Sequence, residues 1–160
     1  MHLARELMFR SSITAPLVVL RPSLLYGAQD PHNGYGPNRF RRLAAQGQPI
    51  ALFGEGEERR DHVYIEDVAE LTLRVLLNRS RGALNIATGQ VRSFREIAHD
   101  VVRIGESASP ILGTTRVGPM PHNGYRAFSV EACQRAFPDF KYTTLEDGLH
   151  RSILEAARGQ

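Results

Sequence analysis

The sequence alternates short strand-like segments with longer segments of helical periodicity. Strands are expected at residues 16–20, 49–54, 61–65 and 82–87. Helices are expected at residues 2–12, 38–48, 66–79, 93–105, 129–137 and about 145–158. Because a parallel strand pair needs a long crossover connection, usually a helix, this alternation favours an α/β fold with some parallel sheet.

Several local signals refine these elements. The continuous apolar run PLVVL (16–20) is typical of a strand buried on both faces. Ser93 and Glu96 predict a capping box for one helix, and Ser129 is expected to cap another. For the last helix, either Thr143 with Glu146 or Thr144 with Asp147 forms the capping pair. Residues 21–37 are rich in Pro and Gly and are expected to form a long loop, whereas residues 109–125 are expected to be extended and loop-rich.

The stretch GEGEERRDHVYIEDVAEL (54–71) carries the densest pattern of charge. Gly54 and Gly56 permit a tight turn, and Arg60 stands just before the expected strand. An arginine fork oriented by Asp61 would suit a phosphate or diphosphate group. The alternative is a solvated charged turn without a ligand, since surface ion pairs are common and weak.

The loop after the first strand offers a second candidate site. Its polar residues could line a pocket beyond the strand ends, or they could serve as ordinary turn formers. They are Tyr26, Asp30, His32, Asn33, Tyr35 and Asn38.

Composition excludes several functional classes. The single cysteine, Cys133, rules out an internal disulfide and a cysteine-rich metal site, and the histidines show no metal-binding spacing. No apolar run is long enough to span a membrane, so we expect a cytoplasmic protein. Net charge is only +3, and the arginines are spread along the chain, which argues against nucleic-acid binding.

Two motifs of dinucleotide-dependent enzymes are missing from these residues. No glycine-rich GxGxxG or GxxGxxG motif follows a strand, and no tyrosine has a lysine four positions later. The residues themselves therefore predict neither a dinucleotide cradle nor a Tyr/Lys proton-transfer pair.

Four stretches resemble, in order, motifs of the extended short-chain dehydrogenases/reductases, specifically the NAD-dependent nucleotide-sugar epimerases and dehydratases. They are LRPSLLYGA (20–28), PIALFGEGEERRDHVYIEDVAEL (49–71), GALNIATGQVRSFREIA (82–98) and FPDFKYTTLEDGLHRSI (137–153). The second stretch is the most specific, and together they cover nearly the whole chain. The resemblance is to the C-terminal half of such an enzyme.

This resemblance implies a fold and a ligand. The C-terminal strands of a Rossmann-like parallel sheet would be interleaved with a small α/β substrate-binding region, about 22–62 and 106–145, within one unit spanning 1–160. The ligand would be a nucleotide sugar, with Arg60 and Arg126 on its diphosphate. The residues implied in substrate binding are Arg60, Asn38, Arg39, Phe40, Ala51, Phe53 and Arg126, and those near the nicotinamide are Pro22 and Ser23.

The first residues, MHLARELM, resemble the helix that carries the catalytic lysine of the family's YxxxK motif. His2 stands at the lysine position, and the tyrosine would precede Met1. We therefore expect no catalytic residue and no metal in this chain. The family's NAD(P) would not be retained by the chain alone, which we expect to be inactive by itself.

Two departures from the family pattern keep alternatives open. Leu24 replaces a substrate-contacting asparagine, and Ser129 replaces an aspartate. One alternative is part of an NADPH-dependent reductase with a non-nucleotide substrate. The other is a non-catalytic interaction module, whose apolar strand edges would pair with a second copy or with a separate N-terminal half.

Overall fold

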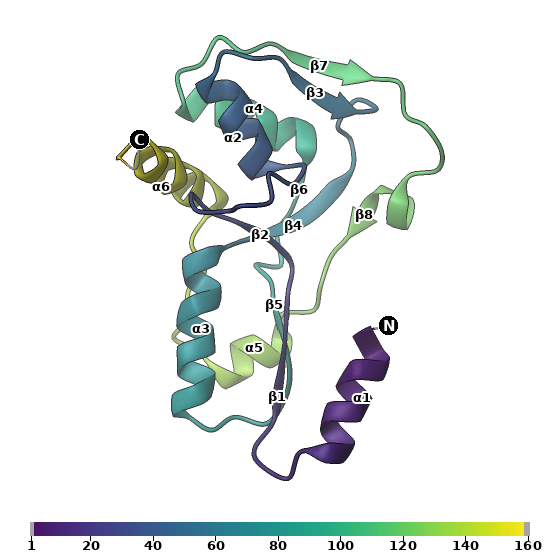
Figure 1. The fold of residues 1–160 in the computed structure, drawn as a ribbon, viewed down its shortest axis with the longest axis vertical. Coiled ribbons are helices and arrows are strands. Elements are labelled where there is room, and N and C mark those ends of the chain that lie inside the picture. The colour runs from purple at the N-terminus through teal and green to yellow at the C-terminus, as the bar shows by residue number, and fades with distance from the viewer. Residues whose placement is uncertain (1, 159–160) are drawn as a thin grey trace.

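The structure, a computed structural model, describes residues 2–158 as two packed regions joined by the strands β2 and β4 (Figure 1). The helices are α1 (His2–Ser12), α2 (Pro37–Ala45), α3 (Ile65–Leu77), α4 (Phe94–Ile104), α5 (Glu131–Ala136) and α6 (Leu145–Arg158), with a 3-10 turn η1 (Pro121–Gly124). The strands are β1 (Val18–Pro22), β2 (Leu24–Tyr26), β3 (Ile50–Phe53), β4 (Arg59–Tyr64), β5 (Gly82–Ile86), β6 (Val91–Ser93), β7 (Ile111–Thr114) and β8 (Tyr125–Arg126).

Most strand pairs are parallel. Strand β1 pairs with β5, β2 with β4, β3 with β7, and β8 with β4, all in parallel, whereas β4 and β6 are antiparallel. The α/β class with parallel sheet is therefore confirmed. No helix within residues 2–158 is long and apolar enough to cross a membrane.

Each region has its own hydrophobic core. In the upper region of Figure 1, α2, α4 and α6 enclose a core that includes Phe40 and Ile97. In the lower region, α3 and α5 pack against β1 and β5 around Val63 and Leu71. The helical spacing of Leu71 and Val75 places both on the buried face of α3, as their sequence period predicts.

The helix caps follow their sequence signals in two of three cases. Ser93 and Glu96 form the expected capping box of α4. At α6, Thr144 and Asp147 form the pair, since the Asp147 amide donates to Thr144 Oγ1 at 3.1 Å. The prediction for α5 is wrong: its N-cap is Val130, so the helix begins one residue beyond the position that Ser129 would cap.

Two further expectations are corrected. The segment 21–37 is not all loop, because Leu24–Tyr26 form β2 beside β4. Strand β1 is only half-buried, with Arg21 exposed, because α3 covers one face while the other borders an open cleft. The predicted turn at 54–58 is present, and Gly56 is required there: its φ is 73°, and a Cβ would approach the Arg95 amide to 3.0 Å.

Candidate functional site

A cleft of about 980 Å³ lies between α1, β1 and the strand β8. Its walls combine apolar side chains from α1 and β1, such as Phe9 and Val19, with the charged side chains of Arg60 and Arg126. Pro22 and Ser23 lie on the same wall, where β1 ends. The cleft is at the upper end of the size range of ligand sites, roughly 300–1,000 Å³.

The pairing of β8 with β4 places the two predicted phosphate arginines side by side. Arg60 and Arg126 are direct partners in the parallel register of these strands. The two residues are far apart in sequence, so neither local pattern could have predicted their adjacency. The cleft thus has two guanidinium groups on adjacent strands, an arrangement suited to an anion with several oxygens.

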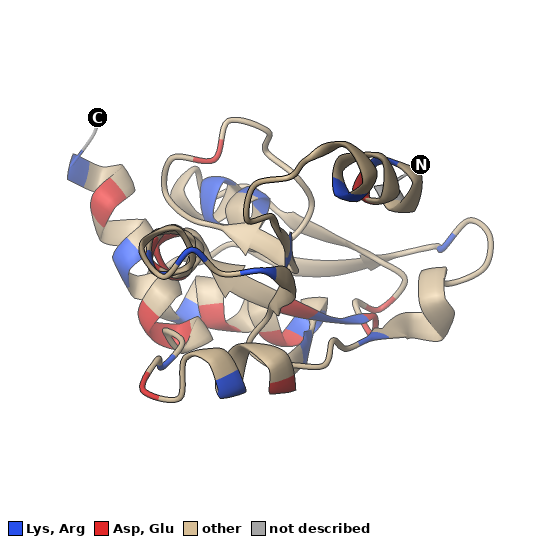
Figure 2. Ribbon diagram, turned by 90° about the horizontal axis from the view of Figure 1, so that it is seen from below, with Lys and Arg blue, Asp and Glu red and all other residues tan. Residues whose placement is uncertain are grey.

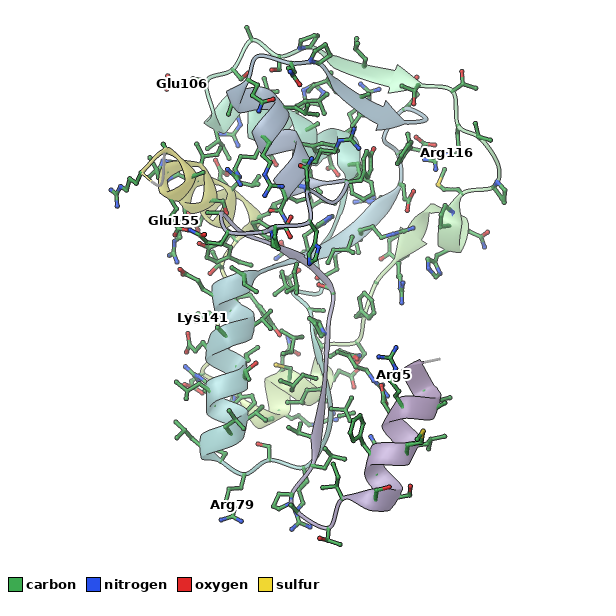
Figure 3. All side chains as sticks on the ribbon, in the orientation of Figure 1. Arg5, Arg79, Glu106, Arg116, Lys141 and Glu155 are labelled. Carbon is green, nitrogen blue, oxygen red and sulfur yellow. The ribbon has the colours of Figure 1, made fainter. Side chains whose placement is uncertain are left out.

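Arg60 is nearly buried, and its fork is held by the chain itself. Its Nη1 donates to the Arg59 carbonyl at 2.9 Å, and its Nη2 donates to the Pro121 carbonyl at 3.0 Å and to Glu58. The sequence pattern could have indicated Glu58, because side chains two apart in a strand lie on one side. Glu58 also lies 3.5 Å from Arg116, on the segment between β7 and β8 labelled in Figure 3.

The prediction that Asp61 orients Arg60 is wrong. The Asp61 carboxylate points to the other side of β4, where it accepts from Ser23 Oγ (2.8 Å), from Thr88 and from the Gly89 amide (2.7 Å). Alternate residues of a strand face opposite sides, so Asp61 and Arg60 cannot both point into the cleft. Asp61 instead ties the end of β1 to the turn that follows β5.

Arg126 is exposed and differs from Arg60 in its partners. Its guanidinium lies 5.2 Å from the centre of the Phe128 ring, and Nη1 is 3.3 Å from His122 Nε2. Within residues 2–158 it forms no ion pair, whereas Arg60 pairs with Glu58 and Arg21 with Glu6. Arg126 therefore contributes a positively charged side chain to the lining of the cleft.

The remaining predicted binding residues lie outside the cleft walls. Asn38 is buried and its Oδ1 accepts the Gly27 amide at 3.0 Å, while Phe40 is fully buried in the upper core. Arg39 is exposed on α2, and Ala51 is exposed on β3. Phe53 is half-exposed, and its amide donates to Tyr35 Oη at 3.0 Å. Whether these residues contact a nucleotide stays a prediction.

The loop 26–38 combines both of its expected roles. A separate cavity of about 250 Å³ is lined by Tyr26, Asp30, His32 and Asn38. In contrast, Asn33 accepts from Arg42 at 3.0 Å, and Tyr35 packs among the aromatic rings of the upper core. Cys133 is buried in the lower core.

The N-termini of α2, α3 and α4 do not have the form of a dinucleotide diphosphate site. Such a site needs free amides at a glycine-rich helix N-terminus. Helix α3 instead begins directly after Tyr64 of β4, the first-turn amides of α4 are capped by Ser93, and α2 has Pro37 at its start. Within residues 2–158, no group of three acidic, histidine or cysteine side chains could hold a metal ion.

Among the histidines of the described residues, His62 on β4 has the pKa that is shifted most. It is nearly buried against the Phe94 ring, and neither ring nitrogen has a hydrogen-bond partner within residues 2–158. Burial lowers the pKa of His62 to about 4, because the charged imidazolium would lose its hydration.

This burial predicts acid sensitivity. The unfolded chain takes up the proton near pH 6.5 and the folded chain only near pH 4, so acidification favours unfolding in that window. Between pH 6.5 and pH 5, we expect the free energy of unfolding to fall by about 2 kcal/mol less in His62→Phe than in wild type. Urea unfolding at both pH values measures it. Replacing the exposed His99 by Gln is the control, and an unchanged pH dependence in His62→Phe would contradict the prediction.

Charge elsewhere is mixed. Basic and acidic residues are interspersed along the helices in Figure 2, and no single-sign face stands out. The cleft, which Arg5, Arg21 and Glu6 line together with Arg60 and Arg126, is therefore the most distinctive concentration of positive charge. The α/β chain with parallel sheet has a partly Rossmann-like architecture, and its arginine-lined cleft runs along one face of β1 to the end of that strand.

Comparison with known proteins defines the family. The sequence profile of the NAD dependent epimerase/dehydratase family matches residues 6–87, about half of the chain. The chain belongs to this family. It is 31% identical, over 67% of its length, to the UDP-N-acetyl-alpha-D-glucosaminuronate decarboxylase of Bacillus cytotoxicus, and covers 34% of that relative.

Two solved structures share the fold over nearly all of this chain. The UDP-glucose 4-epimerase of Thermus thermophilus, in complex with NAD, has a TM-score of 0.79 at 24% identity over 98% of this chain and 51% of its own. The UDP-glucuronic acid 4-epimerase of Bacillus cereus, in complex with UDP-glucuronic acid and NAD, has a TM-score of 0.81 at 20% identity over 99% and 50%. This chain therefore spans about half the length of the structures it matches.

Proposed function

We propose that this chain binds a nucleotide sugar in the cleft between α1, β1 and β8. The observation that carries the proposal is the register of Arg60 and Arg126, which places two guanidinium groups on one wall of that cleft. A diphosphate offers oxygens to both groups, and the apolar surface of β1 and α1 would lie beside the uncharged parts of the ligand.

We assign the substrate-binding region to about residues 22–62 and 106–145. These ranges include most of β4 and all of β8, and hence both cleft arginines. The elements outside these ranges, among them β1, β5, α1 and α3, are assigned to the Rossmann-like part. Support for a nucleotide sugar also comes from the family, since the Bacillus cereus relative is in complex with UDP-glucuronic acid.

Binding should depend strongly on Arg126. We expect Arg126→Met to weaken binding of UDP-glucose or UDP-glucuronic acid by about 10- to 100-fold, the usual effect of losing a charged hydrogen bond. Stability should change little, because Arg126 is exposed and forms no ion pair within residues 2–158. Titration calorimetry on the 160-residue chain measures the dissociation constant.

Arg126 is a better probe than Arg60, because Arg60 is nearly buried and removing it would also break its ion pair with Glu58 and its hydrogen bonds to the Arg59 and Pro121 carbonyls. Arg135→Met, which removes an exposed charge on α5, is the matched control and should leave affinity unchanged. Equal affinities of wild type and Arg126→Met would sink the assigned diphosphate site. No binding of any UDP- or dTDP-sugar at millimolar concentration would sink the proposed function.

A second candidate, an interaction module, is favoured by α1. This helix exposes Leu3, Leu7, Met8 and Phe9, each by more than half. Strand β1 pairs only with β5 among the described strands. Apolar exposure beside an unpaired strand edge is typical of a surface that another chain covers. Sedimentation of the 160-residue chain tests it, and a monomer at all concentrations without any bound partner would contradict it.

A further inference from the structure

Four charged side chains form a cluster beside the proposed nucleotide-sugar cleft. They are Glu57, Glu58, Arg60 and Arg116. Arg60 lines the cleft itself, whereas Arg116 comes from the segment between β7 and β8, where Figure 3 labels it. The two carboxylates balance the charge of the two guanidinium groups, although the cleft is proposed to hold an anion. This balance raises the question of what the carboxylates do at the site.

Glu58, which directly precedes β4, is the carboxylate that both arginines of the cluster share. Its Oε1 accepts a hydrogen bond from Arg60 Nη2, and its Oε2 lies 3.5 Å from Arg116 Nη1. The side chains of Glu58 and Arg60 are only 12% and 8% exposed, so dissolved salt screens their charges weakly. Glu57 differs, because its side chain is 45% exposed and lies 3.5 Å from Arg116.

Glu58 occupies a hydrogen-bond donor of Arg60 that a phosphate oxygen could use. Each Nη of a guanidinium carries two hydrogens. Arg60 Nη2 donates to two acceptors of the chain, Glu58 and the Pro121 carbonyl, the latter at 3.0 Å. A ligand oxygen at Nη2 therefore has to replace one of them. The negative charge of Glu58 also repels a diphosphate bound to the same guanidinium, and both effects act against binding.

The position of Arg60 does not depend on the charge of Glu58. The Arg59 carbonyl accepts from Arg60 Nη1 at 2.9 Å, and the Pro121 carbonyl accepts from Nη2. Both backbone acceptors remain when Glu58 is replaced. The substitution Glu58→Gln also keeps a side-chain oxygen as an acceptor for Arg60 while it removes the charge. Neutralising Glu58 is therefore expected to leave this wall of the cleft in place.

We propose that Glu58 is an internal counter-ion of the cleft, which competes with the diphosphate of the ligand for Arg60 and thereby limits the affinity for a nucleotide sugar. This inference rests on the proposed function and adds to it a residue that weakens binding. When the diphosphate binds, Arg60 exchanges Glu58 for the ligand, and Arg116 remains as the ion partner of the released carboxylate.

Titration calorimetry of Glu58→Gln with UDP-glucose and UDP-glucuronic acid tests the proposal on the 160-residue chain. We expect the variant to bind either ligand about tenfold more tightly than wild type. A merely structural role of Glu58 could lower the affinity or leave it unchanged, but it would not raise it. Glu57→Gln is the matched control, since it removes the same charge from a more exposed side chain, and its affinity should stay within about twofold of wild type.

Arg116→Met tests the same competition from the opposite direction. Without Arg116, Glu58 has Arg60 as its only ion partner within residues 2–158, so we expect the ligand to bind about three- to tenfold more weakly. In the double variant Glu58→Gln/Arg116→Met, most of this loss should disappear, because the competing charge is gone. Arg116→Met leaves the nearly buried pair of Arg60 and Glu58 intact, so it tests the proposal even if Glu58→Gln does not fold.

The outcomes separate this inference from the proposed function. If wild type binds a UDP-sugar and Glu58→Gln binds it no more tightly, the counter-ion role is refuted while the proposed function stands. An equal gain in Glu57→Gln, or an unchanged affinity in Arg116→Met, also refutes that role. If neither wild type nor Glu58→Gln binds any UDP- or dTDP-sugar at millimolar concentration, both proposals fail. Binding by Glu58→Gln alone would support the counter-ion role, with Glu58 closing the site in wild type.

Discussion

Asp61→Asn is expected to destabilise this protein by about 3–5 kcal/mol, lowering Tm by about 10 °C. The Asp61 side chain is 1% exposed, and both of its oxygens accept. Oδ1 accepts the Thr88 amide and Oδ2 the Gly89 amide, at 3.1 and 2.7 Å. An asparagine has only one acceptor oxygen, so either orientation turns its NH₂ group toward a backbone N–H. Urea unfolding followed by circular dichroism measures the loss.

The matched control is Asp139→Asn. Asp139 also accepts a hydrogen bond, from Arg74 at 2.9 Å, but its side chain is 74% exposed, so water replaces the lost contact. We expect no measurable change in Tm for this variant. If Asp61→Asn behaves like the control, the bonds that join β4, β1 and the turn after β5 contribute little, and the account of Asp61 given above is wrong.

Local periodicity predicted most helices and strands because those elements are determined by residues close in sequence. Helix α4 could be predicted from its capping box and its apolar face alone. Strand β2 was missed because LLY is short and lies in a segment rich in Pro and Gly, and only β4 beside it provides hydrogen-bond partners. The half-burial of β1 could not be predicted, because it depends on what covers the far face and not on the strand itself.

In the candidate site, too, some features depend on residues close in sequence and others only on the fold. The local charge pattern and the resemblance both indicated Arg60, and the resemblance alone indicated Arg126, whereas their adjacency comes from a strand pairing across more than 60 residues. The partner of Arg60 was misassigned because adjacency in sequence suggested Asp61, although strand geometry places Glu58 on the correct side.

Gly148→Ala is expected to destabilise the protein by about 3 kcal/mol, even though alanine is the better helix former. In α6 the exchange should gain about 1 kcal/mol of helix propensity. Against this, the new Cβ would overlap Tyr26 Oη and lie 2.8 Å from Tyr26 Cζ. The Tyr26 ring is 2% exposed and packs against Tyr64 with centroids 5.5 Å apart, so it cannot move aside without disturbing the upper core. Thermal and urea unfolding measure the balance.

Tyr26→Phe tests whether the clash with Tyr26 causes the loss of stability in Gly148→Ala. The Tyr26 hydroxyl is buried without a hydrogen-bond partner within residues 2–158, so removing it alone should be neutral or stabilising by up to about 2 kcal/mol. In the double variant Gly148→Ala/Tyr26→Phe, the overlap with the hydroxyl is gone but the ring carbon Cζ remains near the new Cβ. We therefore expect Tyr26→Phe to restore only part of the lost stability, with a non-additive contribution of at least about 1 kcal/mol. Additive effects of the two substitutions would show that the clash with Tyr26 is not what glycine at position 148 avoids. A Gly148→Ala variant more stable than wild type would show that helix propensity outweighs packing at this position.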